Sequence, residues 1–261
     1  MDGLERAIAF MSAHEDSMAE RIELFRWGRA LFNESLPAIY DLNFLRLERV
    51  EHFTAEELAR EAERLQGGLL HRRVNLPDEA AADRVAAGFR ELGWDSERHA
   101  VMVHRREPER SGGPTPVLEV REEDLVSVRR RTLAVEPWAT PSVLEQMLAA
   151  RHLLDRALRV RRFAAAVDGE LVAYCDLYSD GRTGQVEDVA TVPEYRNRGL
   201  ATTLVSHAVE ESRRLGHDLT FLVADAEDWP KELYRKLGFD VVGLYARFVR
   251  RAPGDPGPRR P

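Results

Sequence analysis

The chain has 261 residues, of which 44% are hydrophobic and 32% are charged, and this is the composition of a folded globular protein. Its formal net charge of −7 gives no general attraction to nucleic acid or anionic lipid, and no segment approaches the ~20 consecutive apolar residues that a membrane span requires. The single cysteine, Cys175, excludes an intrachain disulfide, and the eight histidines show no metal-ligand spacing. We therefore expect a cytoplasmic protein that has no metal and no nucleic-acid or membrane partner.

The first half opens with apolar residues at helical spacing and acidic residues between them. This pattern predicts an amphipathic helix over residues 1–25 and not a secretory signal. Residues 42–47 are typical of a strand. Further on, Thr54 and Glu57 match a capping box, which indicates a helix over residues 55–66.

Two segments rich in proline, glycine and charge divide the chain. Residues 107–116 (EPERSGGPTP) predict an exposed linker, and residues 252–261 (APGDPGPRRP) predict a disordered tail. The stretches on either side of the linker are each long enough to bury a core. We therefore expect one domain over residues 1–106 and a second over residues 117–251.

After the linker, hydrophobic patterning predicts two helices, a meander of three strands, and then alternating helices and strands. Asp168-Gly169 marks the first hairpin turn, and Gly216 and Gly238 end the last two helices. The predicted elements are the strand 117–120, the helices 125–133 and 141–158, the strands 163–167, 171–177 and 185–192, the helix 200–215, the strand 219–224, the helix 231–237 and the strand 241–249.

The first half contains a weak copy of the second. Residues 89–106 align without gaps on residues 234–251, with six identities in 18 positions and an offset of 145 residues. At the same offset, the strand 42–47 falls on the strand 187–192, and the helix from Ala55 falls on the helix from Leu200. We interpret this repetition as a duplicated domain.

The segment before the helix at Leu200 is unusual in its charge. Helices normally begin with acidic residues, because the free N–H groups and the helix dipole make that end positive. Here Arg196 and Arg198 precede the helix, and no acid occurs from Tyr195 to Val209. The pattern predicts a site for an anion such as phosphate, which Gly199 allows to approach the backbone closely. In the first half, the capping box closes the equivalent helix end, so we expect no phosphate site there.

These residues resemble the GNAT superfamily of acyl-CoA-dependent N-acyltransferases, whose pyrophosphate loop follows the pattern Q/R-x-x-G-x-G/A. Residues 196–201 (RNRGLA) fit that pattern, residues 187–195 resemble the family's fourth strand, and residues 233–239 resemble its final helix. The resemblance implies an α/β (α+β) fold of two GNAT-like domains, each with a mixed, mostly antiparallel sheet flanked by helices. It also implies acetyl-CoA as the co-substrate, a catalytic domain over residues 117–251 and a degenerate, non-catalytic copy over residues 1–106.

The resemblance further implies roles for individual residues. Glu187 would be the general base, with a strand-edge carboxylate in a salt bridge as the alternative, and Asp188 should point to the opposite face of the sheet. Tyr234 would donate a proton to the sulfur of coenzyme A, and Phe89 at the duplicated position lacks that hydroxyl. Backbone N–H groups of Ala190 and Val192 would meet the pantetheine and the thioester oxygen. The full set of implied cofactor-binding residues is Ala190, Thr191, Val192, Arg196, Asn197, Arg198, Gly199, Leu200, Ala201 and Thr202.

One segment departs from the family pattern. The family usually has an asparagine shortly before the final helix, whereas residues 225–230 of this chain are DAEDWP. The amide donor is therefore missing. We expect Asp228 to cap the helix, Pro230 to lie in its first turn, and Trp229 to pack against that turn or the cofactor.

The sequence thus predicts an N-acetyltransferase that moves an acetyl group from acetyl-CoA to a primary amine of a small molecule or peptide, by direct attack in a ternary complex. Two alternatives stay open: a non-catalytic acyl-CoA-binding regulatory protein, and a mycothiol synthase-like acetyltransferase that uses both domains. A homodimer is compatible with the sequence, which does not identify the acceptor amine.

Overall fold

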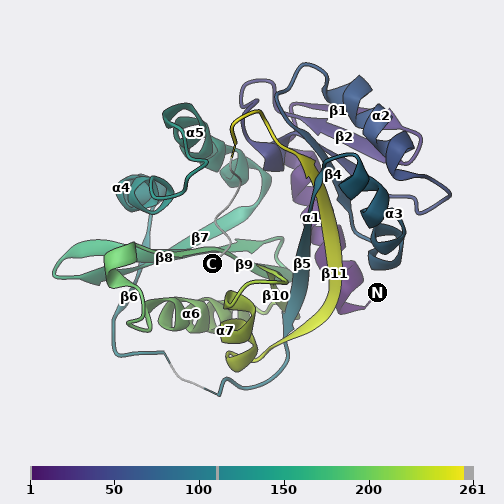
Figure 1. The fold of residues 1–261 in the computed structure, drawn as a ribbon. Coiled ribbons are helices and arrows are strands. Elements are labelled where there is room, and N and C mark those ends of the chain that lie inside the picture. The colour runs from purple at the N-terminus through teal and green to yellow at the C-terminus, as the bar shows by residue number, and fades with distance from the viewer. Residues whose placement is uncertain (1, 110–111, 256–261) are drawn as a thin grey trace.

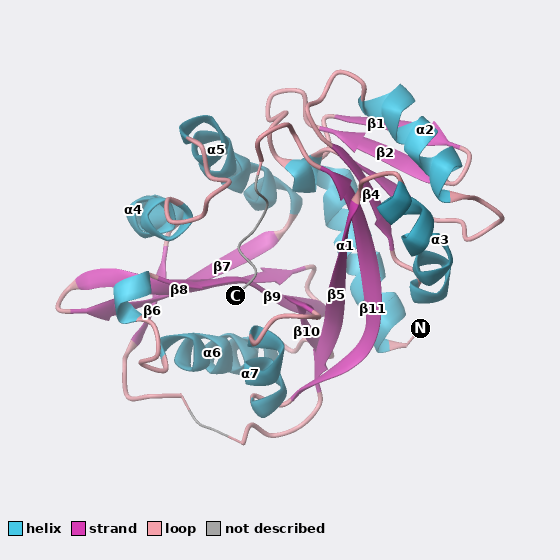
Figure 2. Cartoon of the chain, viewed as in Figure 1, coloured by secondary structure: helices cyan, strands magenta, loops and turns pink. Residues whose placement is uncertain are grey.

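The computed structural model describes residues 2–109 and 112–255, and their strands form one continuous eleven-stranded sheet with the order β1-β2-β3-β4-β11-β5-β10-β9-β8-β7-β6 (Figures 1 and 2). Neighbouring strands run antiparallel except in the pairs β3–β4 and β9–β10, which are parallel. The sheet is therefore mixed and mostly antiparallel. No described helix is both long enough and apolar enough to cross a bilayer.

The first half supplies three helices and five strands. In chain order these are α1 (Gly3–Met18), β1 (Arg21–Phe25), β2 (Gly28–Phe32), β3 (Phe44–Leu47), α2 (Ala55–Gln66), β4 (Arg72–Leu76), α3 (Glu79–Glu91) and β5 (Asp95–His104), with a short 3-10 turn over Tyr40–Leu42.

The second half supplies four helices and six strands. In chain order these are β6 (Val117–Val120), α4 (Glu122–Leu133), α5 (Pro141–Ala157), β7 (Arg159–Val167), β8 (Glu170–Ser179), β9 (Thr183–Thr191), α6 (Leu200–Arg214), β10 (Leu219–Asp225), α7 (Pro230–Lys236) and β11 (Phe239–Arg250), with a 3-10 turn over Pro193–Tyr195. Every element predicted for this half is present.

Helices cover both faces of the sheet. The helices α1, α4 and α5 lie on one face, and α2, α3, α6 and α7 lie on the other (Figures 1 and 2). Side chains alternate along the central strands, so Tyr245 of β11 packs with Phe10 of α1, whereas Phe248 packs with Phe89 of α3. Each face of the sheet is thus a core.

The last strands of the two halves are exchanged. The strand β11 pairs with β4 of the first half and with β5, and β5 in turn pairs with β10 of the second half. The ring of Phe248 on β11 consequently stacks on Phe89 of the first half, with 4.3 Å between ring centroids. The sheet is therefore continuous between the two halves, although the sequence suggested a domain boundary at the linker. Each half contributes one strand that pairs with a strand of the other half.

The N-terminal helix is shorter than predicted. It ends at Met18, because Ala19 adopts an extended conformation, and residues 21–25 form β1. Exposure along β1 alternates with period two, which suits a strand, and the helical spacing of apolar residues continued into β1 only by coincidence. The prediction of a helix over residues 1–25 was therefore wrong beyond Met18.

The predicted linker and tail both touch the folded body. The Gly113 N–H donates to Thr203 Oγ1 on α6 at 2.7 Å, and the Ala252 N–H donates to the Tyr40 hydroxyl at 3.1 Å. Residues 110–111 of the linker and 256–261 of the tail lie outside the described residues. The duplication is visible in the element bounds, because α2 begins at Ala55 and α6 begins at Leu200, at the same 145-residue offset.

Because the exchanged strands join the halves, we predict that Phe248→Ala weakens the whole chain. The change removes a fully buried ring and should lower the free energy of unfolding by about 3–5 kcal/mol. Urea denaturation followed by circular dichroism and by tryptophan fluorescence should give one coincident transition. Two separate transitions, with only one displaced by the substitution, would show that the halves unfold independently.

Candidate active site

The strands β9 and β10 separate in the middle of the sheet. They pair in parallel only from Thr183↔Leu219 to Gln185↔Phe221, and beyond that point a cavity of about 220 Å³ lies between them. Residues 186–189 of β9 and 222–225 of β10 line this cavity, together with Asp228, Pro230 and Tyr234. The structure therefore brings Glu187 and Tyr234, which are 47 positions apart in the sequence, to one cavity.

A β-bulge shapes the wall of this cavity. The register of β9 against β8 shifts between Glu187↔Asp176 and Ala190↔Tyr174, and Asp188 has a φ of 57°. Asp188 therefore lines the same cavity as Glu187 and also contacts Arg129, which binds Asp176 as well. The expectation that the two carboxylates point to opposite faces was wrong, because the bulge interrupts the alternation of side chains.

Glu187 has the environment of a base that works near neutral pH. Burial raises the pKa of Glu187 to about 7, and the nearby charge of Asp188 adds to this rise. Gln185 Nε2 donates a hydrogen bond of 3.2 Å to Glu187 Oε2, which favours the ionised form. A carboxylate with this pKa is partly ionised at neutral pH and can accept a proton from an amine.

Tyr234 lies on α7, and its environment disfavours loss of the phenol proton. Burial raises the pKa of Tyr234 above its ordinary value, and the negative charge of Glu187 acts in the same direction. The phenol therefore stays protonated at neutral pH and is available as a proton donor. Its ring packs edge-on against Phe239, with 6.3 Å between ring centroids.

A buried network of charges supports the bulge. Arg129 of α4 binds Glu122 at 2.9 Å, Asp176 at 2.9 Å, and Asp188. Arg151 of α5 binds Asp176, and its Nη1 lies 3.1 Å from Asp188. The two arginines thus hold the bulge residue Asp188 against α4 and α5. Sequence reasoning missed this network, although an aspartate inside the apolar strand run 173–177 was a visible sign of a buried partner.

The loop before α6 has the open helix end that its charge pattern predicts. Gly199 is the N-cap residue with a φ of 79°, α6 has no side-chain cap, and its first turn contains no acid. Asn197 also has a positive φ, of 61°. Arg196 and Arg198 are exposed, and each donates to a backbone carbonyl of the same loop, at 3.3 and 3.1 Å. Leu200 and Thr202 are buried, so only their backbone N–H groups can serve a ligand.

The first-half counterpart of this helix end is closed. The Glu57 N–H donates to Thr54 Oγ1 at 3.3 Å, and the Thr54 N–H donates to Glu57 Oε2 at 2.9 Å. Both halves of the predicted capping box are therefore present. The start of α2 has its own anionic partner, whereas the start of α6 does not.

The orientation of the β9 backbone differs from the expectation. The Val192 N–H donates to Val172 O at 2.9 Å and so faces β8, and Ala190, two residues earlier, has the same orientation. The expectation that Ala190 and Val192 offer free N–H groups was therefore wrong, because both groups face β8. Thr191 faces away from β8, and its carbonyl accepts a hydrogen bond from Arg196.

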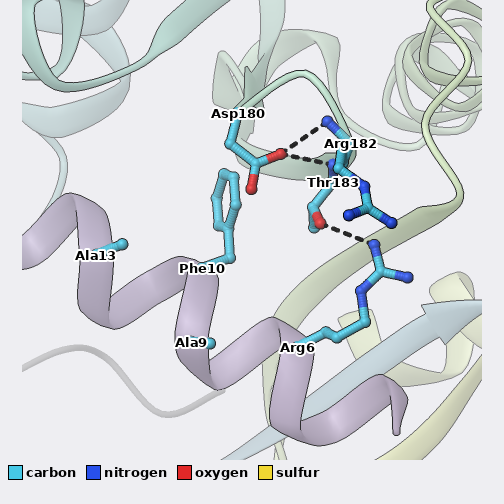
Figure 3. A pocket seen from close by; sticks show the side chains of 7 residues that line it. All are labelled: Arg6, Ala9, Phe10, Ala13, Asp180, Arg182 and Thr183. Carbon is cyan, nitrogen blue, oxygen red and sulfur yellow. Dashed lines mark hydrogen bonds between the residues drawn. The ribbon is translucent and has the colours of Figure 1, made fainter. Parts of the chain in front are cut away.

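A second cavity, of about 490 Å³, lies between α1 and the β8–β9 turn (Figure 3). Its polar side chains bind one another: Arg6 donates to Thr183 Oγ1 at 3.1 Å, and Asp180 accepts from the backbone N–H groups of Arg182 and Thr183. It contains none of the predicted site residues. We therefore place the candidate site at the smaller cavity between β9 and β10. The described residues contain no group of three or more His, Cys, Asp or Glu suited to hold a metal ion.

Comparison with known proteins agrees with this geometry. Residues 123–239 match the sequence model of the Acetyltransferase (GNAT) family. This segment is a GNAT acetyltransferase domain. It contains the cavity, Glu187, the loop before α6 and Tyr234, and it ends at the first residue of β11. No curated protein sequence matches the chain.

Solved structures with the same fold cover almost the whole chain. A functionally unknown conserved protein from Staphylococcus epidermidis has a TM-score of 0.69 at 15% identity, over 90% of this chain and 94% of that one. A GCN5-related N-acetyltransferase from Kribbella flavida has a TM-score of 0.59 at 15% identity, over 96% of each chain. A tandem GNAT protein from the clavulanic acid biosynthesis pathway has a TM-score of 0.51 at 17% identity, over 73% of this chain and 65% of that one. These identities are low, so the likeness concerns the fold alone, and the predicted fold class is confirmed.

Residues 225–230, which differ from the GNAT pattern, do not cap the final helix as we expected. The helix α7 has Trp229 as its N-cap residue and no side-chain cap, so the prediction that Asp228 caps it was wrong. Asp228 instead accepts a hydrogen bond from the N–H of Trp229 at 2.6 Å, and Pro230 lies in the first turn as predicted. Trp229 is 62% exposed and therefore does not pack into that turn.

We predict that Arg129→Met destabilises the GNAT domain strongly, because it leaves the buried Asp176 and the half-buried Asp188 with one arginine fewer. Removing one partner of a buried ion pair costs about 3–5 kcal/mol. The neighbouring change Arg130→Met is the control, since Arg130 is 46% exposed and its pair with Glu145 is on the surface, where such pairs contribute about 0–1 kcal/mol. Urea denaturation measures both, and equal losses in the two variants would contradict the role of the network.

Proposed function

We propose that this chain transfers an acetyl group from acetyl-CoA to a primary amine of a small molecule or peptide. The observation that carries the proposal is the shared cavity of Glu187 and Tyr234, one with a pKa near neutrality and the other held protonated. Acid and base groups with pKa values pushed apart in one cavity are typical of proton-transfer catalysis. The open helix end of α6 follows β9 directly and supplies a place for the pyrophosphate.

Three residues would carry the steps of the transfer. Glu187 takes a proton from the ammonium of the acceptor, directly or through water, which makes the amine nucleophilic. The N–H of Thr191 faces away from β8 and can donate to the thioester oxygen, so we assign this role to Thr191 in place of Ala190 and Val192. Tyr234 protonates the departing thiolate.

Direct attack of the amine fits better than an acetylated cysteine. Cys175 is fully buried, and its thiol donates to Leu204 O at a sulfur–oxygen distance of 3.6 Å. Burial raises the pKa of the Cys175 thiol well above its ordinary value, so it is not a nucleophile near pH 7. The acceptor and acetyl-CoA would therefore occupy the site together.

The loop over residues 196–202 fits a pyrophosphate on physical grounds. The first-turn N–H groups of α6 have no capping side chain among the described residues, and Arg196 and Arg198 add positive charge beside them. An anion at this end gains from both the free donors and the helix dipole. Asn197 and Gly199, each with a positive φ, set the path of the backbone that presents those donors.

The first test of the function is a pH profile. Because Glu187 must be ionised, kcat/KM for amine acetylation should rise as the pH increases through about 7 and level off above it. Glu187→Gln should remove this inflection, and both Glu187→Gln and Tyr234→Phe should lower kcat by about 10²-fold or more. Thiol release from acetyl-CoA, assayed with a panel of polyamines, aminoglycosides, amino acids and peptides, measures the activity of the wild-type chain and of both variants.

Undiminished turnover in Tyr234→Phe would remove that residue as the acid. Saturable acetyl-CoA binding without transfer to any amine in the panel would instead favour the regulatory alternative, a protein that binds acyl-CoA but is not an enzyme.

The second test concerns the loop. Gly199→Ala places a side chain at a φ of 79°, which strains the turn that presents the N–H groups, and we expect the Kd for coenzyme A to rise about tenfold, the equivalent of ~1.4 kcal/mol. Gly216→Ala is the matched control, because Gly216 has a φ of 77° at the other end of the same helix. It should cost similar stability and leave the Kd unchanged. Calorimetry gives both values, and an equal rise in the two variants would argue against the loop as the binding site.

A further inference from the structure

The exchange of strands places a cluster of polar residues beside the catalytic cavity. In the central pair, Tyr245 of β11 lies opposite His99 of β5, and Arg247 lies opposite Glu97, so these four side chains share one face of the sheet. The rings of Tyr245 and His99 stack with 5.0 Å between their centroids. His99 is also the register partner of Asp225, which lines the cavity on β10.

This cluster and Glu187 lie on the same face of the sheet. Tyr245 packs with Phe10 of α1 and with Tyr178 of β8, on the face that α1, α4 and α5 cover. Asp176, the register partner of Glu187, binds arginines of α4 and α5 on that same face. The charges of Arg247 and Asp41 are near enough to act on the pKa of Glu187, in opposite directions.

Arg247 lacks a full set of partners. Its Nη2 donates to the Tyr245 hydroxyl at 2.8 Å, and its Nη1 lies 3.4 Å from Asp41 Oδ1, the oxygen that already accepts from Arg73 at 2.7 Å. Its buried Nε has no hydrogen-bond partner among the described residues. Arg129, by contrast, binds three carboxylates. The charges of Glu97 and Glu15 also act on Arg247, but the described residues give it one ion pair, at 3.4 Å and shared with Arg73, so a further anion would compensate this guanidinium.

We propose that the acceptor of acetyl transfer is an amine that also carries a carboxylate, and that Arg247 binds this carboxylate while the amine lies at Glu187. The inference rests on the acetyltransferase function proposed above. A guanidinium presents parallel N–H groups that match the two oxygens of a carboxylate, so recognition would be directional. The acceptor would lie between the two halves, with Asp41 and His99 of the first half beside it.

The first half then has a part in catalysis that its closed helix end did not suggest. The start of its helix α2 is capped by Thr54 and Glu57, yet it supplies β5 and the Tyr40–Leu42 turn, which carry His99 and Asp41. Arg73 of β4 holds Asp41 in place through the 2.7 Å ion pair. The first half is therefore one wall of the acceptor site.

The test compares each of the twenty amino acids with the amine obtained by removing its α-carboxylate, for instance lysine with cadaverine. The wild-type chain should acetylate at least one amino acid with a kcat/KM at least about tenfold above that of its decarboxylated partner. Arg247→Met should remove that preference mainly through KM, and Arg247→Lys should restore part of it. Loss of the Arg247 charge should also raise the pKa of Glu187 and lower the turnover of both substrates alike, so the ratio of the two kcat/KM values is the quantity that reports the carboxylate contact. The Kd for coenzyme A should not change.

The control is Arg250→Met, which alters the same strand at an exposed arginine paired with Glu63 and should leave the preference intact. Equal or better turnover of the decarboxylated amines, or an equal loss for both substrates in Arg247→Met, would overturn the proposal. If no amine is acetylated at all, the acetyltransferase function fails, and calorimetric titration of the same pairs decides the site separately. Amino-acid binding lost in Arg247→Met would then still support it, and the absence of such binding would reject it.

Discussion

The exchange of β5 and β11 is the constraint on which the rest of the structure depends. Because β5 pairs with β10, the first half contributes a strand beside the cavity of the candidate site, and because β11 pairs with β4, the end of the chain completes the first half of the sheet. The two copies therefore cannot be treated as independent domains joined by a linker. The same exchange places His99 of β5 between Asp225, which lines the cavity, and Tyr245 of β11.

Two local features convert this scaffold into a site. The bulge at Asp188 turns two neighbouring carboxylates toward one cavity. Arg129 and Arg151 bind Asp188 and hold its pKa below the ordinary value, whereas burial raises the pKa of Glu187 to about 7. The open end of α6 then places its free N–H groups directly after the same strand. The uncapped helix end and the carboxylates of the bulge therefore both lie along or just after β9, in the interior of the sheet.

Sequence patterns predicted the parts of this fold that depend on local physics. Hydrophobic period and glycine stops located every element of the second half, and the contrast between Thr54 and Gly199 separated the closed helix end from the open one. Contacts between distant segments were not predictable in this way: the pairing of β11 with β4 leaves no local trace, and Asp176 in its apolar strand indicates a buried partner without showing that this partner is Arg129. The side-chain direction of Asp188 and the N–H direction of Val192 were also predicted wrongly. The reason is the β-bulge, which shifts the later residues of β9 by one position.

Hydrogen exchange of the whole chain, measured with and without coenzyme A, tests the central claim most directly. If the open end of α6 binds the pyrophosphate, the amides of residues 198–202 and the β9 amides near Thr191 should exchange more slowly in the presence of coenzyme A, while those at the start of α2, after Thr54, should not change. Unchanged exchange over residues 198–202, or slower exchange at the start of α2, would contradict the account.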